Sequence, residues 1–195
     1  MTMTPIQRSE ILPIGEYEQI RPHFRGRMIE EKRRRRVVLG DHMSMLFENH
    51  DTVLLQVQEM LRTERITEDR AIDHELSTYN ELIAEPGSVC GTLFIEYDDP
   101  VERARMLVRF ASLRDSVQLH VGGYVSTARF GTHFGEEMDR LPAVNYLTFK
   151  VGAEHAAQLL DAAQPAAIEI THPDYRLRVE LARALREELA RDLSG

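Results

Sequence analysis

The stretch from Arg33 to Glu85 places the strongest constraint on how this chain can fold. After a basic run, apolar residues alternate with polar ones, which is typical of a strand with one buried face. The alternating apolar residues are Val37, Leu39, Met43, Met45 and Phe47. We therefore expect one strand over residues 36–47. Apolar residues then recur at helical spacing on both sides of Thr67, with Asn49 or Asp51 as the first cap, which predicts a helical hairpin.

Both expected helices of this hairpin carry a carboxylate within their apolar stripe. The spacing of the first helix leads to Glu64, and the second helix places Glu75 between its apolar residues. In an antiparallel hairpin the two would lie about one helical turn apart, roughly 5 Å. At that distance carboxylates repel unless they share a proton, a cation or a metal. Together with His74, they are candidate ligands of a divalent metal such as iron or manganese.

Other interpretations of these carboxylates stay open. Di-iron bundles also use helix-borne carboxylates and histidines, but their Glu-x-x-His spacing is absent here. Ion pairs of Glu64 and Glu75 with arginines at the edge of the core are the simpler interpretation, because buried charges are usually paired. An anion-binding or polar specificity network around the two carboxylates is the third interpretation.

The basic run from Lys32 to Arg36 also has two interpretations. Its cations can complement the negative end of a helix dipole before the chain enters the strand, which is the usual role of such a run. The sharper hypothesis is an anion-binding site formed by Arg33, Arg35 and Arg36. Upstream, we expect a helix that begins after Gly15 and is interrupted at Pro22.

The C-terminal half contains an internal repeat. Two segments, TLFIEYDDPVERARMLVRFASLRDSVQLHV and NYLTFKVGAEHAAQLLDAAQPAAIEITH, both indicate strand, helix and strand, with Asp98 or Asp99 capping a helix that begins at Pro100. Doubling this unit predicts a ferredoxin-like βαββαβ antiparallel sheet. We thus expect an α+β fold with residues 1–90 as helical segment, strand and hairpin. Residues 91–195 would form the ferredoxin-like part with a C-terminal helix, both in one compact unit.

Composition excludes several classes of function. With 43% hydrophobic and 29% charged residues, the 195-residue chain is typical of globular proteins, and a formal net charge of -8 disfavours nucleic acid as a partner. It has neither a signal peptide nor a run of about 18 apolar residues, so we expect a cytoplasmic protein that does not span a membrane. Phosphate-loop, dinucleotide, serine-hydrolase and HExxH motifs are absent.

The single cysteine and one acidic connection complete the candidate groups. Cys90 excludes an intrachain disulfide and a four-cysteine cluster, and no neighbouring histidine or helix start lowers its pKa, so we expect an inert thiol. His133 with Glu136 and Glu137 lies in an acidic connection that is more simply interpreted as an exposed loop.

Several segments together resemble an uncharacterised bacterial family, domain of unknown function 3501. The resemblance covers residues 8–193. The segments that carry it are RRRRVVLG, LFEN, TVLLQVQEMLRTERI (the most specific), ELSTYNEL, TLFIEY and HPDYRLRVEL. The family has no assigned activity, so the resemblance implies no catalytic residues. Its members often neighbour rubrerythrin-like proteins and iron–sulfur oxidoreductases, which implies peroxide defence or electron transfer nearby.

These observations favour a non-catalytic accessory or binding protein of a bacterial redox or oxidative-stress system. The partners that the resemblance implies are rubrerythrin-like or iron–sulfur redox proteins. The alternative is a metal-dependent enzyme or sensor with a carboxylate–histidine site on the hairpin, so catalysis stays open. A second copy of the chain could also pair with a sheet edge at residues 36–47.

Overall fold

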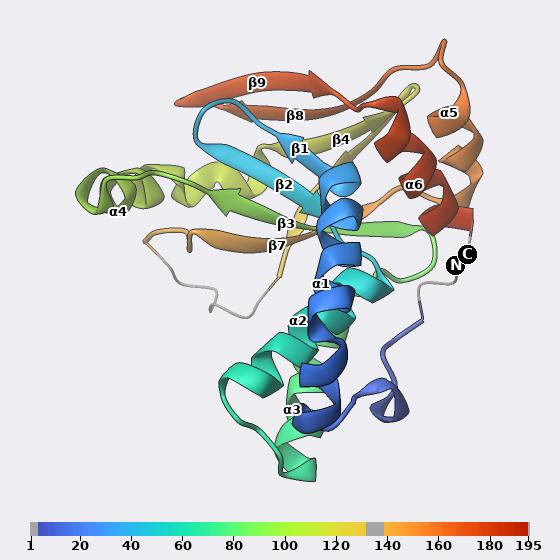
Figure 1. Cartoon of the computed structure of the whole chain (residues 1–195). Coiled ribbons are helices and arrows are strands. Elements are labelled where there is room, and N and C mark those ends of the chain that lie inside the picture. The colour runs from blue at the N-terminus through green and yellow to red at the C-terminus, as the bar shows by residue number, and fades with distance from the viewer. Residues whose placement is uncertain (1–3, 132–138, 195) are drawn as a thin grey trace.

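The computed structural model describes residues 4–131 and 139–194. Within these residues, two antiparallel sheets carry the main core, and three helices extend from them as an arm (Figure 1). We call this the helical arm; it consists of α1 (Ile14–Arg35), α2 (His50–Thr63) and α3 (Asp69–Asn80). No helix in the described part of the chain is both long and apolar enough to cross a membrane.

The first sheet draws strands from both halves of the sequence, and the second draws them from the C-terminal half alone. The first sheet has the order β1 (Arg36–Val38), β2 (Met43–Phe47), β3 (Ser88–Ile95), β7 (Val144–Lys150) and β6 (Arg129–Phe130). The second has the order β5 (Tyr124–Thr127), β4 (Val117–Val121), β8 (Ala166–His172) and β9 (Tyr175–Glu180). One apolar cluster joins side chains of both sheets, so each sheet buries one face against it.

The remaining helices complete this core. They are α4 (Pro100–Arg109), α5 (Ala156–Leu160) and α6 (Arg183–Ser194), with 3₁₀ segments at Arg8–Glu10, Phe110–Asp115 and Ala153–His155. α6 buries Leu185, Leu189 and Leu193 in the main cluster. The arm has cores of its own, one between α2 and α3 and a smaller one between α1 and α2.

The α+β class is confirmed, but the ferredoxin-like sheet is not. β3 pairs with β7 and β4 pairs with β8, yet the two pairs lie in different sheets. The physical reason is the segment between the two repeats. It leaves the second sheet after Thr127 and joins the first at Arg129, so β6 occupies the edge of β7. The expected boundary at residue 90 also falls within β3.

The prediction of one strand over residues 36–47 is wrong, because the segment is a hairpin. β1 and β2 pair antiparallel, and the turn between them contains Gly40 with a φ of 73°. Val37 lies opposite Met45, so the alternating apolar residues still share one face. The sequence pattern of a hairpin with this loop length is therefore the same as that of a continuous strand.

The predicted interruption of the first helix at Pro22 is also wrong. α1 is continuous through this residue, which lies on its exposed side. A proline removes one backbone hydrogen bond and crowds the preceding turn. Burial of Tyr17, Phe24 and Met28 on either side of it holds the helix together.

Candidate functional site

The hairpin residues predicted to bind metal do not converge. α2 ends at Thr63, Glu64 caps its end as an exposed residue, and Arg65 adopts a left-handed φ of 54°. The expectation that Glu64 points inward is therefore wrong, because the helix stops before its stripe reaches that position. His74 is exposed and Glu75 half-buried. Among the described residues, no group of three or more histidine, cysteine or acidic side chains could hold a metal ion.

Glu75 instead lies beside an aromatic group. Burial raises the pKa of Tyr79 to about 12, with further contributions from Tyr146 and from the charge of Glu75. The arginine pairing expected for the hairpin carboxylates is not formed by Arg62, whose Nε lies 3.3 Å from Glu18 Oε1.

The three arginines of the predicted anion site have three different surroundings. Arg33 is exposed and pairs with Glu30 within α1. Arg36 donates to Ser44 Oγ over 2.7 Å and lies 5.1 Å from the ring centre of Phe94. Arg35 is buried. The end of the helix and the start of β1 thus distribute these side chains rather than gather them.

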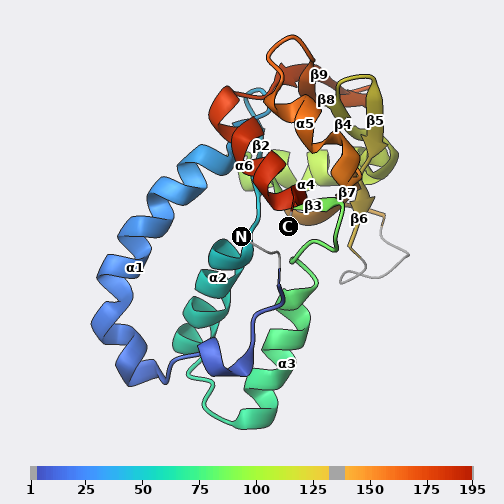
Figure 2. The ribbon, with the colours of Figure 1, turned by 90° about the vertical axis from the view of Figure 1, so that its right-hand side faces the viewer.

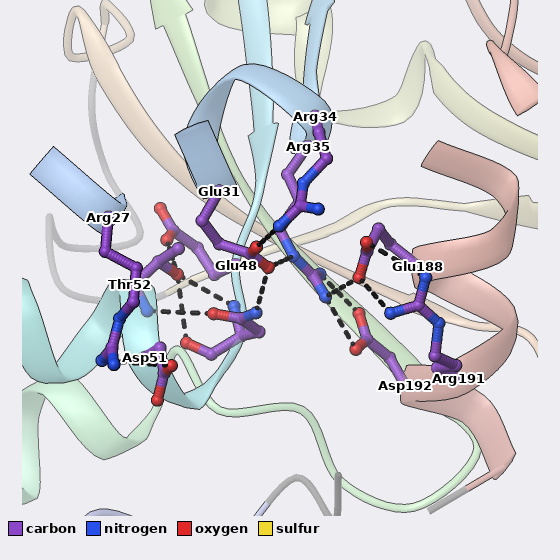
Figure 3. Close-up of polar contacts among 11 residues, drawn as sticks. Arg27, Glu31, Arg34, Arg35, Glu48, Asp51, Thr52, Glu188, Arg191 and Asp192 are labelled. Atoms are coloured by element: carbon purple, nitrogen blue, oxygen red, sulfur yellow. Dashed lines mark hydrogen bonds and ion pairs between the residues drawn. The ribbon is translucent and has the colours of Figure 1, made fainter. Parts of the chain in front are cut away.

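Arg35 is the centre of a buried cluster that joins α1 to α6 (Figure 3). Its Nε donates to Glu31 Oε1 over 2.7 Å, its Nη1 to Asp192 Oδ2 over 2.7 Å and its Nη2 to Glu188 Oε2 over 3.2 Å. Burial lowers the pKa of Arg35, but the bonds and charges of Asp192 and Glu31 outweigh it, and the net shift is upward. We call these four residues the Arg35 cluster. Because its guanidinium is occupied by carboxylates, it serves to hold the fold.

Glu48 is a second buried acid, at the end of β2. It is 2% exposed, and its carboxylate accepts hydrogen bonds of 2.6 Å from the hydroxyls of both Thr52 and Thr92. Its backbone N–H donates to the carbonyl of Cys90 over 2.9 Å. Neutral hydroxyls thus satisfy this carboxylate where β2, β3 and α2 meet, which indicates a structural role.

A cavity of about 670 Å³ lies against the neighbouring part of the first sheet. Its floor is a row of side chains across three strands, because Cys90 of β3 and Arg129 of β6 both pair in register with Thr148 of β7. The end of α3 and the segment that follows it form another wall, with Asn80, Ile83 and Glu85 among its lining residues. We call it the sheet cavity. Its volume is within the usual range of small-molecule sites, about 300–1,000 Å³.

The floor of the sheet cavity combines two neutral groups, the Cys90 thiol and the Thr148 hydroxyl, with the charged Arg129. Burial raises the pKa of the Cys90 thiol, which lies 3.4 Å from Thr148 Oγ1, so the thiol stays protonated, in accordance with the expected inert thiol. Arg129 lowers and Glu85 raises the same pKa, so both charges are near it. The arrangement can therefore bind a charged ligand but lacks an activated sulfur nucleophile.

The sequence interpretation did not single out Thr148 or Arg129. Nothing local marks either residue, because their position beside Cys90 follows from strand register alone. The predicted group of His133, Glu136 and Glu137 lies outside the described residues.

The similarities to known proteins extend over nearly the whole chain. A family model described as protein of unknown function (DUF3501) matches residues 5–193. The chain belongs to this family. A crystal structure of a protein of unknown function from Burkholderia pseudomallei K96243 is similar to the DUF3501 chain with a TM-score of 0.91 and 29% identity. The similarity covers 98% of this chain and 100% of the other. No curated protein matches.

Proposed function

We propose that this DUF3501 protein is a non-catalytic binding protein and that the sheet cavity is its ligand site. The observation that supports this most is the floor formed by Cys90, Thr148 and Arg129, which three strands hold in register beneath a cavity of about 670 Å³. Groups on paired strands are held in place before a ligand arrives, which reduces the ordering cost of binding.

The charges around the cavity favour a small zwitterion as the ligand. Arg129 supplies a guanidinium, which binds carboxylates through paired hydrogen bonds. Glu85, also in the lining, supplies a carboxylate for an ammonium group. The neutral Cys90 thiol and Thr148 hydroxyl, in the same row as Arg129, suit the uncharged part of such a molecule. Amino acids and short peptides have this distribution of charge.

The redox setting implied by the family resemblance is part of the proposal. We propose that the protein acts as a cytoplasmic accessory of a bacterial redox or oxidative-stress system, with rubrerythrin-like or iron–sulfur proteins as partners. Survival of hydrogen peroxide tests this setting, because a strain without the protein should be more sensitive than its parent. Equal survival of the two strains would contradict it.

Calorimetric titration with a panel of amino acids and dipeptides tests the ligand site. We expect binding by at least one member and a loss of about tenfold or more in affinity for Arg129→Gln, because the charged hydrogen bonds to the carboxylate are lost. Arg176→Gln is the matched control, since Arg176 is exposed on β9 in the other sheet.

The single cysteine provides a second readout. The buried, protonated Cys90 reacts slowly, so the reaction with a small thiol reagent is followed at alkaline pH. A bound zwitterion should slow this reaction further in the wild-type protein but not in Arg129→Gln. The proposal fails if no member of the panel binds, or if both arginine variants change affinity equally.

A further inference from the structure

The segment that precedes α1 is held in place by two side-chain amides. We call residues 4–13 the strap; Figure 2 shows it beside α2 and α3 on its way to α1. The Asn80 amide accepts from the backbone N–H of Ile6 over 2.8 Å and donates to its carbonyl over 3.1 Å. Gln58 binds Leu12 in the same way, over 2.8 and 3.3 Å. Each amide thus satisfies both backbone groups of one strap residue, as a neighbouring strand would.

Apolar side chains anchor the strap near the same two places. Ile6 and Ile11 are 3% and 6% exposed, and both belong to the core between α2 and α3. The ion pair of Arg8 with Asp69 lies between these anchors and is exposed, so it contributes little. One amide and one isoleucine therefore hold each end of the strap.

The two ends of the strap differ in their relation to the sheet cavity. Pro5, immediately before Ile6, lines that cavity together with Asn80. Leu12 and Gln58, at the other end, do not line it. The hold on Ile6 thus decides where one wall of the cavity stands, whereas the hold on Leu12 does not.

This wall can move without unfolding the sheets. A segment opens locally at a lower free energy than the whole protein when few buried contacts hold it. Residues 4–13 belong to neither sheet, and two isoleucines anchor them in the core of the arm. The floor of the cavity, by contrast, is fixed by strand register. The sheet cavity therefore combines a rigid floor with a wall of lower stability.

We infer that Asn80 is a positioning residue of the sheet cavity: its bonds to Ile6 keep the strap in place as a wall, and this wall limits the size of the molecule that reaches the floor. The inference rests on the proposed function, because it describes how that same cavity selects its ligand. A wall at Pro5 favours a single amino acid over a longer peptide.

Alkylation of Cys90 measures access to the floor without any ligand. Wild type and variants react with iodoacetamide at alkaline pH, and mass spectrometry follows the reaction. Asn80→Ala should raise the rate about tenfold, because both hydrogen bonds to Ile6 are lost. Gln58→Ala is the matched control, since it removes the equivalent bonds at Leu12 and should change the rate less than about twofold.

A second pair of variants separates the strap from the Asn80 side chain, which itself lines the cavity. Ile6→Ala leaves that lining intact and removes a buried anchor, so it should also raise the rate about tenfold. Ile11→Ala removes a comparable anchor from the same core at the other end and should leave the rate near that of wild type. Thermal melts that show similar losses within each pair exclude general unfolding as the cause of a difference.

The inference and the proposed function fail in different ways. Equal alkylation rates within either pair would overturn the inference, and an effect of Asn80→Ala alone would mean that this side chain covers the floor by itself. If no amino acid or dipeptide binds, the proposed function fails, while the alkylation rates still decide the role of the strap. If amino acids bind, Asn80→Ala should reduce the preference for single amino acids over dipeptides. An unchanged preference would contradict selection by size.

Discussion

The Arg35 cluster and the sheet cavity use the same chemical groups in opposite ways. Arg35 is 2% exposed, and three carboxylates of its own chain surround its guanidinium. Arg129 is exposed beside an open cavity, near Glu85 and a neutral thiol. The first arrangement neutralises charge internally and joins residues 157 positions apart in sequence. The second leaves charge accessible, so we assign stability to the first and binding to the second.

The largest expected effect is on stability, for Arg35→Met. This change leaves Asp192 without the cation that it pairs with, and leaves Glu31 and Glu188 with only the exposed Arg34 and Arg191 as partners. Removing one partner of a buried pair in this way costs about 3–5 kcal/mol. Urea denaturation followed by circular dichroism measures the free energy of unfolding.

Arg34→Met provides the control for that change. Arg34 is the neighbouring residue, also pairs with Glu31, and has a side chain that is 52% exposed. Its removal should cost less than about 1 kcal/mol. Similar losses in the two variants would mean that burial does not separate structural from accessible arginines here.

The ion pair of Arg21 with Glu59 is intermediate in exposure between the Arg35 cluster and the sheet cavity, so it extends the comparison of buried with accessible charges. Hydrogen bonds from Arg21 lower the pKa of Glu59 to about 2 against its partial burial, and a bond from the Tyr17 hydroxyl lowers it further. Since the folded pKa lies below the ordinary value of 4.5, the stabilisation is complete above pH 4.5 and is lost as pH falls through about 2. Glu59→Gln should cost about 1 kcal/mol at neutral pH.

The pH dependence of that cost is the decisive measurement. The difference in unfolding free energy between wild type and Glu59→Gln should shrink as pH falls from 4.5 towards 2. Glu18→Gln is a control, because the side chain of Glu18 is 50% exposed and pairs with Arg62 over 3.3 Å. A difference that stays constant over this window would contradict the assigned ion pair.

Local features of this fold are predictable from sequence, whereas the sites depend on distant partners. Asn49 caps α2 and Asp99 caps α4, as expected, because both bonds join residues three apart. Of the apolar residues at helical spacing in α2, Val53, Val57 and Leu61 are buried as predicted, and Leu54 and Met60 are half-buried.

Three features fail or are missed for one common reason. The end of α2 before Glu64, the carboxylates around Arg35 and the row of Cys90, Thr148 and Arg129 all depend on how distant segments pack. The spacing of apolar residues identifies a helix face but not where the helix stops or which strand will lie beside it. Charged residues near a predicted core are therefore weak indicators of a site when the strand register and the helix ends are unknown.

The smallest expected effect is that of Glu64→Ala combined with Glu75→Ala. Glu64 is exposed at the C-terminal end of α2, where a negative charge is unfavourable, so its loss should change stability by less than about 0.5 kcal/mol. We also expect equal metal content in wild type and double variant, both purified without chelator, by elemental analysis. Stoichiometric iron, manganese or zinc that disappears in the double variant would show that the hairpin holds a metal. The carboxylates of the helical arm would then be a binding site as well, in addition to the charged groups at the sheet cavity.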